Sequence, residues 1–202
     1  WNIKRLVKQI YMSATYRQSS VITPEKLKAD PGNIYLSYAP RIRMNAEMVR
    51  DMALASSGLL QPIIGGPSVK PYQPPGLWEL ATSGRGLLAS YKQDHGDKLY
   101  RRGMYTFIKR TVPPPAMMIF DASNRDQCEV KRSRTNTPLQ ALIMMNDPTI
   151  LEASVALADY LTQKEEKPEA AVTDAFLRII NRHPAKQEQD ILLAYLNEQQ
   201  AY

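Results

Sequence analysis

One segment of the chain, from 120 to 136, gathers residue types that hold anions or move protons. Its polar side chains include Asp121, Arg125, Arg132, Arg134 and Asn136. A guanidinium group donates two parallel hydrogen bonds to a carboxylate, sulfate or phosphate. A carboxylate such as that of Asp121 orients an arginine or acts as a base. The pattern predicts either an anion site or a network of ion pairs that pins an irregular segment to helices.

A second candidate is the segment from 64 to 78, which is rich in glycine and proline and contains Lys70, Tyr72 and Trp78. Glycines let backbone N–H groups approach a ligand closely, and Lys70 could meet an anion there. Tyr72 and Trp78 could stack on sugar rings or pack in the core. The spacing of a phosphate-binding P-loop is absent. We therefore expect either a binding loop or a rigid loop that wraps the core.

Three further residues could take part in a site. Arg101 and Arg102 place two guanidinium groups next to each other, and we count them among the anion-binding candidates. His95 stands beside Asp94, so it could act as a general base, although a role in a turn or helix cap explains it equally. His95, Asp121 and Arg125 are the candidates for catalysis.

Metal and cofactor chemistry has no local motif in this chain. The spacings typical of covalent haem attachment, structural zinc and zinc proteases do not occur. The chain has one cysteine, Cys128, and its two histidines, His95 and His183, are far apart. We expect Cys128 to be a small buried side chain. The sequence therefore predicts no metal site and no cofactor within this chain.

The charge of the chain is positive but dispersed. Its 26 basic and 20 acidic residues give a net charge of +6. Because these basic residues are spread along the sequence, we expect no nucleic-acid partner. No apolar run approaches the roughly 20 residues that cross a bilayer. A transmembrane segment is therefore not predicted.

The elements that must position these residues are helices. Residues 2–14 and the last third of the chain show apolar residues at helical spacing. In the helix expected after Asn45, the predicted buried stripe is Met48, Met52, Ala55 and Leu59. Thr137-Pro138 and Asp147-Pro148 are typical helix starts. The fold class predicted is mostly α: an irregular helical domain with a long Pro/Gly-rich central loop region and a C-terminal helical hairpin.

The expected division of the chain follows from these elements. We predict a main helical domain over residues 1–163, with a proline-rich central segment at 59–136. A helical hairpin over residues 164–202 is expected to pack on it, and the two could form one single domain.

Five strings of residues carry a family resemblance. They are SATYRQSS at 13–20, RMNAEMVRD at 43–51, GGPSVKPYQPPGLW at 65–78, LYRRGMYTF at 99–107 and RTNTPLQAL at 134–142. Together they resemble the C-terminal domain of unknown function of the large planctomycete-type cytochrome c proteins. The resemblance covers nearly the whole chain and corresponds to the C-terminal portion of that domain.

This resemblance implies an exported, periplasmic or cell-envelope parent protein. Such a parent carries haem c in a separate upstream domain, and the chain's partners would be those upstream domains and a polysaccharide. The function expected is an accessory or binding module that recognises an anionic glycan or a partner domain. The alternative is part of a hydrolase or redox enzyme site that upstream domains complete.

Overall fold

The computed structural model describes residues 1–86, 88–123, 125–165 and 167–200 and divides the chain into two compact units. The units are Trp1–Arg43 and Met44–Tyr202. The boundary predicted between residues 163 and 164 falls inside the second unit. Within the described ranges the secondary structure is helical, with isolated bridges and no strands, so the predicted mostly α fold is confirmed.

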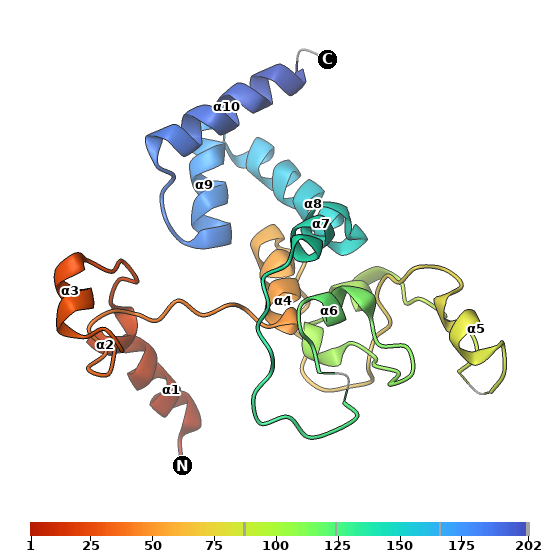
Figure 1. Cartoon of the computed structure of the whole chain (residues 1–202). Helices are drawn as coiled ribbons and strands as arrows, with labels where there is room; N and C mark the ends of the chain where they lie inside the picture. Colours follow the sequence, from red (N-terminus) through yellow and green to blue (C-terminus); the bar gives the residue numbers. More distant parts are fainter. Residues whose placement is uncertain (87, 124, 166, 201–202) are drawn as a thin grey trace. The chain divides into compact units, whose positions relative to one another are not determined.

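The first unit consists of α1 (Ile3–Met12), α2 (Ala14–Arg17) and α3 (Pro24–Ala29), followed by an irregular segment (Figure 1). The side chain of Thr23 caps α3 by accepting a hydrogen bond from the N–H of Lys26. Asp30 is buried and accepts hydrogen bonds from the N–H groups of Ile34 and Tyr35. This carboxylate therefore organises the turn that follows α3.

The second unit is built on α4 (Ala46–Ser57) and α8 (Pro148–Lys164), which pack against each other. Two short helices pack against α4: α6 (Pro115–Ile119) and the 3-10 helix η2 (Gly103–Tyr105). Helix α7 (Pro138–Asn146) packs against α6 and α8, and the 3-10 helix η1 (Gly96–Tyr100) accepts a hydrogen bond from Arg50 of α4. Helix α9 (Pro168–Ile180) packs against α8 and against α10 (Lys186–Gln200). The last two helices form the predicted C-terminal hairpin.

The central segment between α4 and α7 is irregular, as its prolines predicted. Besides the short helices it contains α5 (Leu77–Thr82) and three isolated bridges. The parallel bridges join Gln61 to Arg101 and Val69 to Thr106. They attach the proline-rich loop to the segment that contains η1 and η2.

The buried face of α4 differs from the predicted one. Its buried residues are Ala46, Val49, Ala53, Leu54 and Ser57. The predicted stripe was wrong, because Met48 is 51% exposed. The backbone of η2 also approaches α4 closely: a Cβ added to Gly103 would lie 2.9 Å from the Cα of Glu47.

Several helix ends follow the sequence signals. Thr137 and Gln140 form a capping box at α7, and the side chain of Asp147 caps α8. Gly58 ends α4 in a left-handed conformation, with φ of 79°. In the described ranges no single helix meets the length and apolarity needed to cross a membrane, whereas α7 and α8 together do so with a bend of 56° between them.

Candidate functional site

A small pocket lies in the second unit, between α4, the proline-rich loop and the junction of α7 with α8. We call it the Arg50 pocket. It has a volume of about 60 Å³. Its lining consists of Ala46, Val49, Arg50, Pro71, Tyr72, Thr106, Pro114, Ala116, Met117, Phe120, Ile143, Asp147, Thr149 and Ile150.

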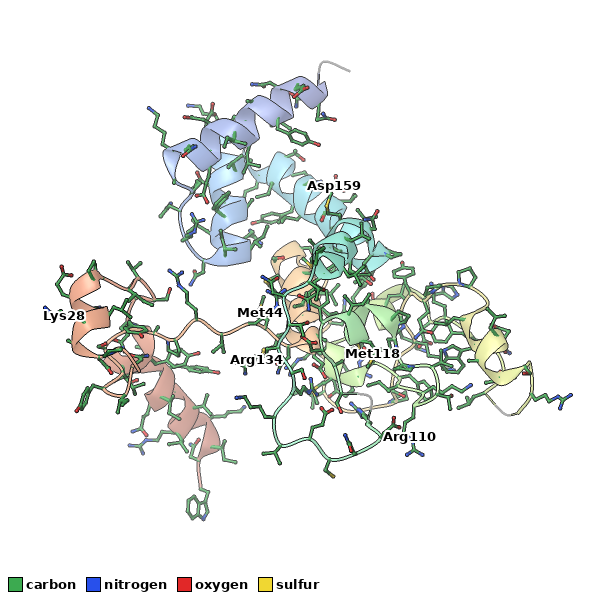
Figure 2. All side chains as sticks on the ribbon, in the orientation of Figure 1. Lys28, Met44, Arg110, Met118, Arg134 and Asp159 are labelled. Atoms are coloured by element: carbon green, nitrogen blue, oxygen red, sulfur yellow. The ribbon has the colours of Figure 1, made fainter. Side chains whose placement is uncertain are left out.

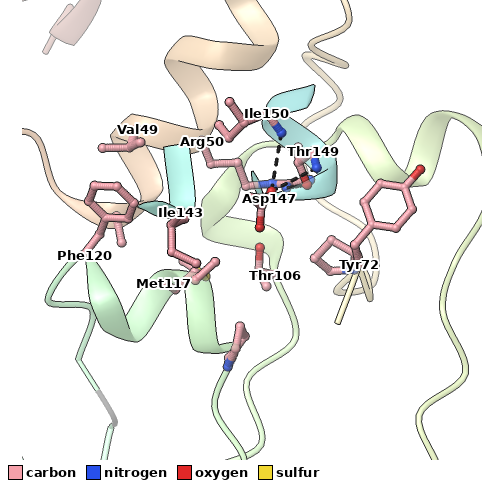
Figure 3. Close-up of a pocket in the computed structure, with 14 residues that line it drawn as sticks. Val49, Arg50, Tyr72, Thr106, Met117, Phe120, Ile143, Asp147, Thr149 and Ile150 are labelled. Atoms are coloured by element: carbon pink, nitrogen blue, oxygen red, sulfur yellow. Dashed lines mark hydrogen bonds between the residues drawn. The ribbon is translucent and has the colours of Figure 1, made fainter. Parts of the chain in front are cut away.

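The pocket has an apolar side and a polar side. Figure 3 shows Val49, Phe120, Met117 and Ile143 together on one side. Three polar groups converge opposite them: the guanidinium of Arg50, the hydroxyl of Thr106 and the carboxylate of Asp147. Such a combination of an apolar wall with a few convergent polar groups is typical of ligand sites.

Arg50 enters the pocket from α4. Its Nη1 donates to the hydroxyl of Thr149 at 3.2 Å, and its Nη2 donates to the carbonyl oxygen of Leu99. Its Nε is buried and has no hydrogen-bond partner among the described residues. Burial lowers the pKa of Arg50, and nearby carboxylates, chiefly that of Asp147, oppose that change.

Thr106 and Asp147 face each other across the pocket (Figure 3). Thr106 is 5% exposed, and its buried Oγ1 has no partner within the described part of the chain. The Oδ1 of Asp147 accepts hydrogen bonds from the N–H groups of Thr149 at 2.9 Å and Ile150 at 3.4 Å. The cap of α8 therefore fixes the orientation of this carboxylate.

Two tyrosines beside the pocket share one carboxylate. Tyr72 donates to Oε2 of Glu152 at 3.1 Å, and Tyr100 donates to Oε1 at 2.8 Å. Burial and the hydrogen bond to Glu152 raise the pKa of Tyr72. The hydrogen bond to Glu152 and burial raise the pKa of Tyr100 to about 12. Both phenols therefore stay protonated, and Glu152 holds the ring of Tyr72 in place.

A larger groove adjoins the Arg50 pocket and shares Tyr72, Pro114, Ala116, Ile143 and Asp147 with it. We call it the proline groove. Its volume is about 360 Å³, and its other lining residues are Gln73, Pro74, Pro75, Pro115, Asn146 and Pro148. Prolines have fixed φ angles, so these walls lose little conformational freedom when a ligand binds. The groove and the pocket together form the candidate site.

The predicted loop candidates divide between this site and the core. Tyr72 lines the site. Trp78 is fully buried, and its ring contacts Tyr91 and Phe107. The ammonium of Lys70 lies 5.9 Å from the centre of the Trp78 ring. Lys70 and Trp78 are therefore close together, and neither lines the pocket or the groove.

Arg101 is buried and holds the start of the proline-rich loop through hydrogen bonds. Its guanidinium donates to the carbonyl oxygens of Ile63, Gly65 and Pro67, at 3.0, 2.5 and 2.8 Å. It also lies 3.9 Å from the ring centre of Tyr105, whose hydroxyl accepts from the N–H of Gly65. Within the described ranges no carboxylate lies at ion-pair distance from Arg101. The hydrogen bonds of its guanidinium are therefore with backbone carbonyls of the loop.

Two of the other arginine candidates form ion pairs with carboxylates. Arg102 contacts Asp51 at 3.2 Å, and Arg132 contacts Glu47 at 2.7 Å. Burial, the largest single influence, raises the pKa of Glu47. The hydrogen bond from Arg132, a backbone hydrogen bond and the charges of Arg132 and Arg125 together outweigh burial, so the pKa of Glu47 is lowered. Arg134, labelled in Figure 2, and Asn136 lie on the extended segment before α7.

The three catalytic candidates lie outside the pocket and the groove. Asp121 accepts hydrogen bonds from the N–H and the hydroxyl of Thr135, and so holds two ends of the 121–136 segment together. His95 and Arg125 are exposed. Cys128 is also exposed, so the expectation of a buried thiol was wrong. The described residues contain no cluster of three or more His, Cys, Asp or Glu side chains suited to a metal.

The main residues of the site were not among the predicted ones. Arg50 and Thr106 occur inside two of the strings that carry the family resemblance, and Asp147 was recognised only as a helix start. No local motif marks them, because they come from α4, the residue after η2 and the α7–α8 junction and meet only in the folded unit.

A second groove lies on the C-terminal hairpin. It has a volume of about 480 Å³ and an almost entirely apolar lining. The lining residues are Val172, Ala175, Phe176, Ile179, Ile180, Leu192, Tyr195, Leu196 and Gln199. We call it the hairpin groove.

Comparison with known proteins places the chain in a family. No curated protein matched it, and no solved structure did. The model of PSD1, a protein of unknown function (DUF1553), matches residues 1–196. This agrees with the expected domain of unknown function. Because the match spans nearly the whole sequence, the chain belongs to the PSD1 family of proteins of unknown function.

Proposed function

We propose that this chain is a carbohydrate-binding accessory module of a larger exported protein that carries a c-type haem in another domain. The observation that supports binding is the set of unpartnered polar atoms in the Arg50 pocket, at one end of the proline groove. The family resemblance motivates the exported parent and its haem domain. The ligand proposed is a polysaccharide chain.

The chemistry of the site suits a sugar. Sugar hydroxyls both donate and accept hydrogen bonds, and the site offers a donor in Arg50, an acceptor in Asp147 and a hydroxyl in Thr106. The ring of Tyr72 and the prolines of the groove offer apolar contact to the C–H faces of a sugar ring. The groove volume of about 360 Å³ is within the range of small-molecule sites.

An array of neutral, uronic and sulfated glycans, followed by calorimetry on the full chain, tests this proposal. The key variant is Thr106→Val, which keeps the side-chain shape and removes the unpartnered hydroxyl. We expect its affinity for the bound glycan to fall about three- to tenfold, the usual value of one hydrogen bond. The matched control is Thr162→Val, which removes an exposed hydroxyl on α8, and its affinity is expected to be unchanged.

The same variants separate binding from folding. Since Oγ1 of Thr106 is buried without a partner, its removal breaks no hydrogen bond between described residues. The free energy of unfolding of Thr106→Val is therefore expected to be unchanged or higher. The proposal fails if no glycan binds at millimolar concentration. It also fails if binding depends on Arg132 and Arg134 and is unaffected by Thr106→Val, since the site would then lie elsewhere.

We also propose that another domain of the parent protein covers the hairpin groove. Ile179, Ile180 and Leu192 line this groove and are exposed, and removing such apolar surface from water is favourable. Introducing Ile179→Glu into the intact parent protein is expected to increase protease sensitivity at the domain junction. Leu80→Glu, an exposed position outside the groove, is the control. Equal sensitivity of both variants would contradict this part of the proposal.

A further inference from the structure

The Arg50 pocket is much smaller than the groove beside it, and its size limits what enters it. A volume of about 60 Å³ exceeds the ~10–15 Å³ that one water molecule needs, so the pocket holds a few oxygen-sized groups. A sugar ring requires the larger proline groove. A ligand that occupies both would therefore lie with its ring in the groove and with substituents of one ring edge in the pocket.

The hydrogen-bonding groups in the pocket are complementary to hydroxyls. Arg50 Nε supplies an N–H donor, and Thr106 Oγ1 can donate or accept. The hydrogen bonds that Asp147 accepts from the described residues go to Oδ1, so Oδ2 can accept from a ligand. Two adjacent hydroxyls can donate to the carboxylate while they accept from the guanidinium and from Thr106.

The charges around the pocket disfavour an anion. The guanidinium of Arg50 is accompanied by the carboxylate of Asp147 in the lining and by that of Glu152, which holds Tyr72. Within the described residues neither carboxylate forms an ion pair within 4.0 Å. An acidic group that entered the pocket would meet Asp147 Oδ2 directly, and at short range like charges repel strongly in a partly buried site.

From these features we infer that the Arg50 pocket is a subsite for two adjacent, uncharged hydroxyl groups of a sugar and that it discriminates against acidic sugars. This inference rests on the proposed carbohydrate binding and narrows its ligand class from glycans in general to neutral ones. It replaces the anionic glycan that the arginine-rich segment suggested.

The test uses three oligosaccharides of the same length and linkage. One is neutral, one carries a carboxylate at C6 of its terminal ring, and one lacks one of two adjacent hydroxyls on that ring. Calorimetry on the full chain is expected to give at least about tenfold weaker binding for the acidic probe than for the neutral one. The deoxy probe is expected to bind about three- to tenfold more weakly.

The Asp147→Asn variant tests the cause. Asparagine is as good a helix N-cap as aspartate, so α8 keeps its start while the charge is removed. The ratio between neutral and acidic affinities is expected to shrink towards one. Equal or tighter binding of the acidic probe by the unmodified chain would overturn the inference, and so would an unchanged ratio in Asp147→Asn. If no probe binds, the proposed function itself fails, which is a separate result.

Discussion

Trp78 is the largest side chain that the second unit buries completely, with 0% exposure. The ring of Trp78 lies edge-on to the ring of Tyr91, with 5.0 Å between the ring centres. The ammonium of Lys109 lies 4.5 Å from the centre of the Trp78 ring. The proline-rich loop and α5 therefore share their packing with the segment around Phe107. A tryptophan expected to be either a sugar platform or core packing is in the core.

Replacing this ring is expected to destabilise the second unit. Trp78→Ala leaves a cavity that the rigid neighbouring prolines cannot fill, so the free energy of unfolding should fall by about 3–5 kcal/mol. Urea denaturation followed by circular dichroism measures this change. Trp1→Ala is the control, because Trp1 is fully exposed and its loss should have no measurable effect.

At the scale of residues, the sequence shows which side chains can form ion pairs or bind anions, but not which groups they contact in the fold. The arginines were predicted to form either an anion site or a network of ion pairs. Whether a given arginine binds a ligand, a carboxylate or a carbonyl depends on residues distant in sequence. Arg132 meets Glu47 and Arg101 meets the 63–67 loop, and no local pattern predicts either contact.

Among the elements, the turn between α9 and α10 has a carboxylate with a strongly altered pKa. Hydrogen bonds from Arg182, at 2.6 and 2.7 Å, and from the N–H of Ala185 lower the pKa of Glu188 from 4.5 to about 2. A carboxyl group with a lower pKa in the folded state stabilises the fold above its unfolded pKa. This contribution is therefore present above pH 4.5 and lost as the pH falls towards 2.

The Arg182→Gln variant is expected to raise the pKa of Glu188 back towards 4.5, because the largest interaction that lowers it is removed. An NMR titration of the Glu188 side-chain carbonyl measures the change. In the control, Lys186→Gln, a nearby positive charge is lost while the hydrogen bonds remain, and the pKa should stay near 2. A similar shift in both variants would attribute the effect to general charge and not to the hydrogen bonds.

The close approach of η2 to α4 depends on the absence of a side chain at position 103. The N–H of Gly103 donates to Asp51, and an added Cβ would meet the backbone of Glu47 at 2.9 and 3.0 Å. Gly103→Ala is therefore expected to lower the free energy of unfolding by about 1–3 kcal/mol, as overpacking usually does. Gly32→Ala is the control, since its nearest contact is a flexible side chain at 3.4 Å. Equal stability of both variants by urea denaturation would contradict this account.

Helix starts and ends were the best-predicted features among the elements. Thr137, Asp147 and Gly58 act through bonds to neighbouring residues, so their roles are readable locally. The buried face of α4 was predicted wrongly, because the stripe that contains Met48 satisfies helical periodicity as well as the stripe that contains Val49 and Leu54 does. The choice between them is made by the backbone that packs against α4, and this is a tertiary effect.

The whole chain consists of two units, and each is expected to be separable. The linker residues Pro40–Met44 are exposed and belong to no helix. If a recognition sequence for a site-specific protease replaces residues 41–43, cleavage should leave the fragment from Met44 onward with an unchanged thermal transition. If the same recognition sequence is instead inserted between Arg101 and Arg102, cleavage is expected to abolish that transition, because it cuts the chain next to Arg101, whose side chain holds the proline-rich loop. Loss of the transition in the first case would show that the second unit depends on the first.

At this largest scale the sequence predicted the helical class and the hairpin, and it placed the domain boundary elsewhere. The proline-rich middle was predicted inside the main domain, and it lies inside the second unit, where its prolines line a groove. The unit boundary at Arg43 has no such compositional signal.

The Arg101 anchor has a consequence for acid tolerance. Its acceptors are three peptide carbonyls, which neither gain nor lose a proton under physiological conditions. Dissolved ions also compete poorly with a donor that is 6% exposed. The hydrogen bonds that hold this loop are therefore expected to persist at low pH and at high salt. The exposed ion pair between Arg182 and Glu188 is expected to break in strong acid.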